Sequence, residues 1–360
     1  MDKYWELLYN TQKLYVRFAM NKTLTRVQLN ILPVGSGDCL HLRFQSSGRW
    51  HNVIIDSGPG STSGVFRKLL KQIETHKEVV DLLCFSHIDD DHIKGAEDVF
   101  ASPSFDPNLI RQVWLNVPNG EIPAKSEAGT FSPKSVETAI KLLKFIVKYE
   151  IPLVPTVTEG LELILGDARI KTVLPKQKRL DAFYEKWNKD AERFRTKSVR
   201  KDTSITNGSS IALLCTIGSR RLLMVGDAFA DDLADVGDQY AGEQGFSVVK
   251  IPHHGSDENV TAKMIQSLNT REFIISTEQN KYRPGCNAMS VLSSYGAGPE
   301  GVTVYGNYVW PRFAAGVPNV KIICPKNKFN LTKDGIEVYS DGNSSQLYAE
   351  QACGSDSQEQ

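Results

Sequence analysis

The segment at residues 86–92, S-H-I-D-D-D-H, constrains this chain more than any other. It places two imidazoles and three carboxylates directly after a short apolar run. Divalent metals need such density, because each ion takes four to six nitrogen or oxygen donors. In an extended segment His87 and Asp89 can point the same way. Asp91 and His92 can then aim at a second point, so the spacing predicts two metal ions; the alternative is a solvated acidic loop after a strand.

Three other short apolar runs deliver an ionisable side chain at their C-terminal ends. Loops held at the ends of sheet strands are where α/β scaffolds build their sites. Four of the seven histidines fall in two clusters, and none occurs from residue 93 to residue 252. We therefore expect these strand ends to meet at one site. The side chains at the three further strand ends are Asp56, Asp227, and the pair His253 and His254.

The order of these segments resembles the metallo-β-lactamase superfamily, and more narrowly the branch that contains the soluble hydrolase domain of the ComEC DNA-uptake channel. Asp89 stands where the wider superfamily has the second histidine of its first motif. The V-G-S-G-D turn at 34–38 and the N-G-S-S segment at 207–210 also resemble that branch. The resemblance covers residues 28–340.

The resemblance implies an α/β fold: an αββα sandwich of two packed mixed β-sheets with helices on the outer faces. It implies a hydrolase domain over residues 25–345, between an N-terminal extension at 1–24 and a disordered, Ser- and Gln-rich tail at 346–360. A charged helical insertion is expected at about 176–201. It is either a surface helix with a packed stripe, which includes Phe183 and Trp187, or a basic patch facing the substrate.

Together with the spacing, the resemblance assigns His87 and Asp89 to a first metal ion. Asp91 and His92 are assigned to a second ion, and Asp91 is also a candidate catalytic residue. Asp227 is the expected bridge, because one carboxylate can offer an oxygen to each ion. The neighbouring Asp90 is expected to point into solvent.

The histidine pair is divided between two roles. His253 is preferred as the ligand that completes the second site. His254 is then the candidate catalytic residue that donates to a substrate oxyanion or leaving group. Asp56 is expected behind the ligands, where it orients an imidazole.

The chain departs from the family pattern in two places. A lone metal-binding histidine of the superfamily is missing, and Asn207 is either its substitute or a turn residue that caps a strand. The branch's late His-Pro pair is also missing, and Arg283 stands before the corresponding proline. Arg283 and Ser256 are the candidate substrate contacts.

The expected cofactors are two divalent ions. Aspartate in place of histidine at position 89 makes the first site more oxygen-rich, which favours Mn²⁺ or Mg²⁺. Zn²⁺ is the alternative, because the general affinity order places it above Mn²⁺.

Three functions are consistent with these features. The leading hypothesis is a dimetal phosphodiester hydrolase, a DNA nuclease by resemblance to the channel domain. The second is a hydrolase of a small molecule such as a cyclic nucleotide, lactone or thioester. The third is a catalytically degraded relative that binds metal or a partner. The 42 basic and 42 acidic residues give a net charge of zero, so DNA binding would need a local basic patch.

The six cysteines are widely spread without a C-x-x-C pair, which predicts a reducing compartment. The sequence shows neither a long apolar span nor a signal-peptide pattern at its start. We therefore expect a cytoplasmic protein that does not associate with a membrane.

Overall fold

The structure is a computed structural model that describes residues 27–118, 134–196, 204–297, 299–324, 329–332 and 335–338. The expected N-terminal extension and C-terminal tail lie outside the described residues, as does the end of the charged insertion at 197–201.

The described strands form two eight-stranded mixed sheets. The order in the first sheet is β16-β15-β1-β2-β3-β4-β5-β6, and in the second it is β14-β13-β12-β11-β10-β9-β8-β7. The strands of the first sheet are β1 (Val27–Ile31), β2 (Leu40–Ser46), β3 (Arg49–Ile55), β4 (Leu82–Cys84), β5 (Val113–Trp114), β6 (Leu153–Val154), β15 (Phe329–Thr332) and β16 (Gly335–Val338). Those of the second sheet are β7 (Glu162–Leu165), β8 (Ala168–Leu174), β9 (Ala212–Ile217), β10 (Arg220–Met224), β11 (Val248–Lys250), β12 (Glu272–Ile275), β13 (Val302–Gly306) and β14 (Val320–Ile323).

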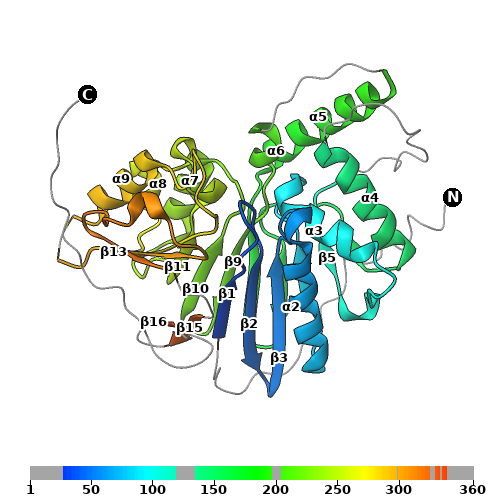
Figure 1. Ribbon diagram of the computed structural model, residues 1–360, viewed down its shortest axis with the longest axis horizontal. Coiled ribbons are helices and arrows are strands. Elements are labelled where there is room, and N and C mark those ends of the chain that lie inside the picture. The colour runs from blue at the N-terminus through cyan, green and yellow to red at the C-terminus, as the bar shows by residue number, and fades with distance from the viewer. Residues whose placement is uncertain are drawn as a thin grey trace.

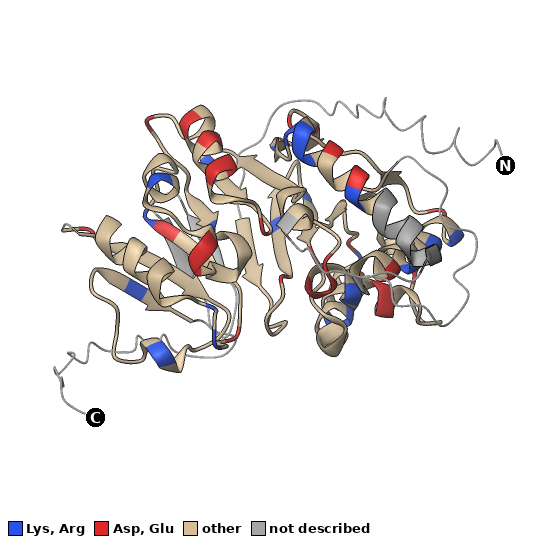
Figure 2. Cartoon of the chain, turned by 90° about the horizontal axis from the view of Figure 1, so that it is seen from above, with Lys and Arg blue, Asp and Glu red and all other residues tan. Residues whose placement is uncertain are grey.

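Helices flank the pair of sheets on both outer sides, with α2 to α5 beside the first sheet and α7 to α9 beside the second (Figure 1). Charged residues of both signs are interspersed over these helices (Figure 2). The helices are α2 (Ser63–Thr75), α3 (Asp90–Phe100), α4 (Lys134–Lys148), α5 (Gln177–Thr196), α6 (Ser204–Gly208), α7 (Ala230–Tyr240), α8 (Ala262–Ser267) and α9 (Cys286–Tyr295). Short 3₁₀ turns occur at η2 (Gly60–Thr62), η3 (Pro107–Leu109), η4 (Pro252–Gly255), η5 (Asp257–Asn259) and η6 (Pro311–Phe313).

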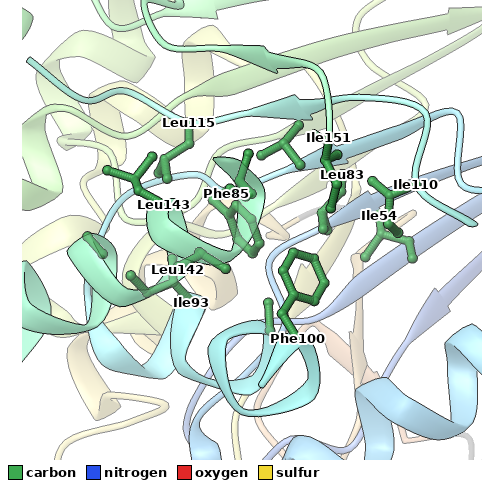
Figure 3. Close-up of a cluster of buried hydrophobic side chains, with 14 of the residues drawn as sticks. Ile54, Leu83, Phe85, Ile93, Phe100, Ile110, Leu115, Leu142, Leu143 and Ile151 are labelled. Carbon is green, nitrogen blue, oxygen red and sulfur yellow. The ribbon is translucent and has the colours of Figure 1, made fainter. Parts of the chain in front are cut away.

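The protein has four layers, with the two sheets lying between two layers of helices. A hydrophobic core fills each of the three interfaces between these layers. Val53 and Ile55 of β3 lie in the layer between the two sheets. Ile54, on the opposite face of the same strand, lies in the layer under α2 to α5, with Phe85 and Phe100 (Figure 3). Successive strand residues point to opposite faces, so a strand buried on both sides must be apolar throughout. This burial explains the continuous apolar runs and confirms the αββα sandwich.

The apolar runs before Asp56, the motif at 86–92, Asp227 and the histidine pair form β3, β4, β10 and β11, and helix α3 follows the motif. That helix begins at Asp90 and therefore already contains part of the motif. Its first residue corrects one prediction, because Asp90 is half-buried and its Oδ1 accepts a hydrogen bond from Thr138 Oγ1 at 2.7 Å. Elements that the sequence did not indicate include the two-residue strands β5 and β6, strand β15, and helices α6 and α9.

The charged insertion forms α5, which packs on the body of the protein. Phe183 and Trp187 lie in the hydrophobic layer under this helix, which confirms the packed stripe. Near its start, the Arg179 guanidinium lies 4.7 Å from the ring of Phe229, two residues after Asp227. None of the described helices combines the length and apolar character needed to cross a membrane.

Candidate metal centre

The C-terminal ends of four strands, two from each sheet, meet at one place. Strands β3 and β4 lead into Asp56 and the motif at 86–92, and β10 and β11 lead into Asp227 and the histidine pair. Backbone hydrogen bonds join the loops: Ile211 N donates to Ser86 O at 2.7 Å. Gly226 has a φ of +50°, and a Cβ there would lie 2.6 Å from Ser86 Cβ, so only glycine permits this approach.

One group of side chains faces Oδ1 of Asp227, and we call it the inner cluster: Asp91, His92 and His254. Nε2 of His92 lies 3.6 Å from this oxygen, and Nε2 of His254 lies 3.7 Å from it. Asp91 Oδ2 lies 3.5 Å from His254 Nε2 and 4.0 Å from His92 Nε2. Oδ1 of Asp227 and Oδ2 of Asp91 therefore each lie within 4.0 Å of both imidazole nitrogens.

A second group faces Oδ2 of Asp227, and we call it the outer cluster: His87, Asp89 and His253. His87 Nε2 lies 4.0 Å from Oδ2 and 3.6 Å from Asp89 Oδ2. His253 Nε2 lies 3.6 Å from the same Asp227 oxygen. The two oxygens of one buried carboxylate therefore face two separate sets of nitrogen and oxygen atoms.

The donor atoms fit divalent metal ions. Ligands bound tetrahedrally at about 2.1 Å from an ion lie about 3.4 Å apart, close to the separations seen here. Within the described part of the chain, Nε2 of His87, His92 and His254 and Oδ1 of Asp227 are buried without a hydrogen-bond partner. Buried polar atoms rarely lack partners, so atoms that converge in this way indicate a place for a cation.

Hydrogen bonds behind the inner cluster fix the tautomer of each imidazole. His92 Nδ1 donates to Asp56 Oδ2 at 2.8 Å, and His254 Nδ1 donates to the Ser276 carbonyl at 2.9 Å. With Nδ1 as the donor in both rings, Nε2 carries the lone pair that a metal would take.

Asp56 supports both clusters from a left-handed conformation with a φ of +61°. Its carboxylate accepts hydrogen bonds from the backbone N and the Oγ of Ser86, each at 2.7 Å. Ser86 Oγ in turn lies 3.0 Å from Nδ1 of His87 and can accept a hydrogen bond from it. Asp56 therefore contacts His92 directly and His87 through one hydroxyl.

Two site residues were missed by the sequence analysis, Asp38 and Lys250. Both are buried, and they form an ion pair. Lys250 Nζ also donates to the Gly226 carbonyl at 2.8 Å. Asp38 Oδ1 lies 3.3 Å from Nδ1 of His254, which places this carboxylate behind the imidazole. The signal in the sequence was a lone lysine inside the apolar run that leads to the histidine pair.

The distances favour the opposite assignment of the histidine pair. It is His254, and not His253, that lies with Asp91 and His92. Its Nδ1 is bonded to the Ser276 carbonyl and its Nε2 faces Oδ1 of Asp227 at 3.7 Å, so it is not placed to donate a proton to a leaving group. Both histidines have positive φ, +49° and +56°, a conformation that the sequence did not reveal and that directs the two rings apart.

Apart from Asp227, the polar side chains that contact His253 are a neutral amide and a guanidinium. Its Nδ1 donates to Asn259 Oδ1 at 2.8 Å, and its Nε2 accepts a hydrogen bond from the Arg283 guanidinium. Burial lowers the pKa of His253; the Asp227 carboxylate opposes this, and the positive charge of Arg283 adds to the lowering. Arg283, a candidate substrate contact, therefore reaches the site itself.

In the inner cluster the pKa values of the histidines are raised, not lowered. Burial acts to lower the pKa of His92, but the carboxylates of Asp227, Asp56 and Asp91 outweigh it and raise this pKa well above the usual range. Burial likewise opposes the carboxylates beside His254, which raise its pKa to about 9. The inner cluster thus attracts positive charge, whether a proton or a metal ion.

The two remaining candidates lie beside the site. Asn207 is buried at the end of α6, and three residues later Ser210 Oγ accepts a hydrogen bond from Asp227 N at 3.2 Å. Ser256 is half-buried, and its backbone N donates to the His253 carbonyl at 3.0 Å. The serine of the N-G-S-S segment thus supports the proposed bridge through its backbone.

A sequence profile described as the metallo-beta-lactamase superfamily matches residues 48–275. The match contains every member of the inner and outer clusters, whereas Asp38 and Arg283 lie outside it. No curated protein matches the chain.

Several solved structures align with most of this chain at low sequence identity. The metallo-beta-lactamase fold protein YhfI from Bacillus subtilis is 12% identical, with 85% of this chain and 100% of that chain covered and a TM-score of 0.42. A diphosphatase of the PhnP family is 13% identical, with 86% and 98% covered and a TM-score of 0.41. Zn²⁺-bound PqqB from Methylobacterium extorquens is 10% identical, with 84% and 99% covered and a TM-score of 0.39. Similarity at this level carries no argument about activity.

Proposed function

The chain belongs to the metallo-β-lactamase superfamily, whose members are generally hydrolytic metalloenzymes, and we propose that it hydrolyses phosphodiester bonds of DNA. The observation that carries the proposal is the position of Asp227. Its Oδ1 faces two imidazole nitrogens of the inner cluster, and its Oδ2 faces two of the outer cluster. A carboxylate in this position supports a pair of ions more readily than a single one.

The proposed ligands follow from these distances. Asp91, His92 and His254 would hold one ion, and the outer cluster would hold the other. Asp227 would contribute to both sites. Bound divalent ions lower the pKa of water to near neutrality and neutralise charge on the oxygens of a phosphodiester.

The protein side chains supply positioning and charge. Asp56 and Ser276 hold the inner imidazoles with Nε2 facing inward, so reorganisation on metal binding is small. Asp38 and Lys250 form a neutral pair behind them, which adds fixed dipoles without adding net charge. The oxygen-rich donor set is compatible with Mn²⁺ or Mg²⁺ as well as Zn²⁺.

DNA as the substrate is proposed from the resemblance to the ComEC hydrolase domain. Location in the cytoplasm is also a proposal, and the cysteines support it. Cys39, Cys84 and Cys215 are buried free thiols that pack as small apolar residues.

The function is tested by incubating the metal-loaded protein with single- and double-stranded DNA in Mn²⁺. A cyclic nucleotide, a lactone and a thioester are tested separately as alternative substrates. We expect DNA cleavage that EDTA abolishes and added Mn²⁺ restores. Hydrolysis of the lactone or thioester without cleavage of any phosphodiester would overturn the proposal.

A further inference from the structure

Two loops beside the metal centre, residues 279–285 and 306–313, are bonded to each other, and we call them the rim. Arg312 joins them from one side. Its backbone N donates to Gln279 Oε1 at 2.6 Å, and its guanidinium donates to the carbonyls of Asn280 and Pro284 at 2.8 and 3.1 Å. The Asn280 side chain accepts from two backbone N–H groups of its own loop, so the loop is held in one shape.

The rim is anchored on both sides of the metal centre. Gly285 N donates to the Gly255 carbonyl at 2.9 Å, directly after the histidine pair. Tyr308 Oη accepts a hydrogen bond from Gly35 N at 2.9 Å, near the start of the turn that carries Asp38. Arg283 extends from the rim to His253 Nε2. The rim thus borders the outer cluster.

The rim also exposes large apolar side chains. The described chain has three exposed large hydrophobic residues, and two of them, Tyr282 at 68% and Val309 at 70% exposure, lie on the rim. The ammonium group of Lys281 lies 5.3 Å from the centre of the Tyr282 ring. An exposed aromatic ring on a loop that hydrogen bonds hold in place, flanked by two cations, is suited to a ligand that is both anionic and aromatic.

We propose that the rim binds a nucleotide of a single nucleic-acid strand, with its phosphate on Arg283 and its base stacked on Tyr282. The inference rests on the proposed phosphodiester hydrolysis and adds a preference for single strands. Bases in a duplex are already stacked on each other, whereas those of a single strand present free faces to an aromatic side chain. Arg283 would contact the phosphate beside the outer cluster, where its planar guanidinium suits two phosphate oxygens.

Binding is measured by fluorescence anisotropy with the EDTA-treated full chain, a labelled single-stranded DNA 12-mer, and an abasic strand of the same length. Tyr282→Ala should weaken binding of the 12-mer by about 10-fold, in the range of base–aromatic stacking. Tyr282→Phe, which keeps the ring, should bind within about twofold of the wild type. Ile164→Ala, which removes an exposed hydrophobic side chain on β7 outside the rim, should behave like the wild type.

The abasic strand should bind the wild type about as weakly as the 12-mer binds Tyr282→Ala. Arg283→Gln should reduce the slope of log affinity against log salt by about one, because one phosphate contact is lost. Equal binding of the 12-mer by the wild type and Tyr282→Ala, or of the two strands by the wild type, would overturn the inference.

The measurement involves neither metal nor turnover, so its failure is separable from failure of the proposed function. A wild type that cleaves DNA while Tyr282→Ala retains full binding defeats only the rim. A wild type that cleaves no phosphodiester defeats the function itself.

Discussion

The inner and outer clusters share one carboxylate but differ in what stands behind their imidazoles. Behind the inner histidines are a carboxylate, Asp56, and a backbone carbonyl, and the rings are fully buried. Behind the outer histidines are a hydroxyl and an amide, and the side chain of His253 is 19% exposed. Anionic partners raise the basicity of a ligand imidazole more than neutral ones do.

Arg283 widens the difference between the clusters. Its N–H donates a hydrogen bond to the lone pair of His253 Nε2. A metal ion that binds His253 must therefore first displace the Arg283 guanidinium. The inner cluster has no comparable guanidinium among the described residues, and its only adjacent ammonium, Lys250, is paired with Asp38. We infer that the inner cluster binds the tighter metal ion and the outer cluster the weaker one.

The largest effect is expected where the two clusters are joined. Asp227→Asn keeps the shape of the side chain but removes the charge that both proposed ions would share. Metal content should fall well below two ions per chain, and phosphodiesterase activity by at least about three orders of magnitude, because the ions supply most of the stabilisation of the transition state. Metal analysis and turnover of a generic phosphodiester in Mn²⁺ measure both; wild-type turnover would show that the ligands are misassigned.

An effect of intermediate size is expected in the pH dependence of thermal stability, to which the two clusters should contribute differently. The pKa of His254 is about 9 in the folded, metal-free chain, against about 6.5 for a histidine in an unfolded chain. The folded state therefore binds this proton more tightly. Its contribution to stability is fully present below pH 6.5 and is lost as pH rises through about 9. The melting temperature of EDTA-treated protein should fall by several degrees over this range.

Two histidine variants serve as controls for that pH dependence. His254→Asn should weaken it, because one of the two histidines with a raised pKa is gone and His92 remains. His253→Asn should leave the fall in place, because the pKa of His253 is lowered rather than raised. An equal pH dependence in wild type and His254→Asn would contradict the electrostatic difference between the clusters.

The smallest effect is expected at Asp90, next to two proposed ligands in sequence. Its carboxylate accepts a hydrogen bond from Thr138 Oγ1, which the amide oxygen of Asn can also accept. Asp90→Asn should therefore keep metal content and retain most of the activity. A loss of activity as complete as that of Asp227→Asn would mean that the metal ligands within residues 86–92 are assigned to the wrong positions.

The sandwich was predicted from the resemblance to a known superfamily, whereas the strand ends were predicted from local patterns. Apolar runs that end in Asp or His are visible without knowledge of tertiary contacts, as at Asp56 and Asp227. The separate positions of His253 and His254 depend on two left-handed residues in succession, which no composition pattern signals. Strand β15 and the partnership of Asp38 with Lys250 arise from contacts between segments far apart in the chain.

The central claim, a tight inner and a weak outer metal ion that share Asp227, is tested most directly by calorimetric titration of EDTA-stripped wild type and His253→Ala with Mn²⁺. The account predicts two binding events in the wild type, with dissociation constants at least about tenfold apart, as partners behind the ligands commonly produce. In His253→Ala the weaker event should disappear and the tighter one remain. A single event in the wild type, or loss of the tighter event in His253→Ala, would contradict the account.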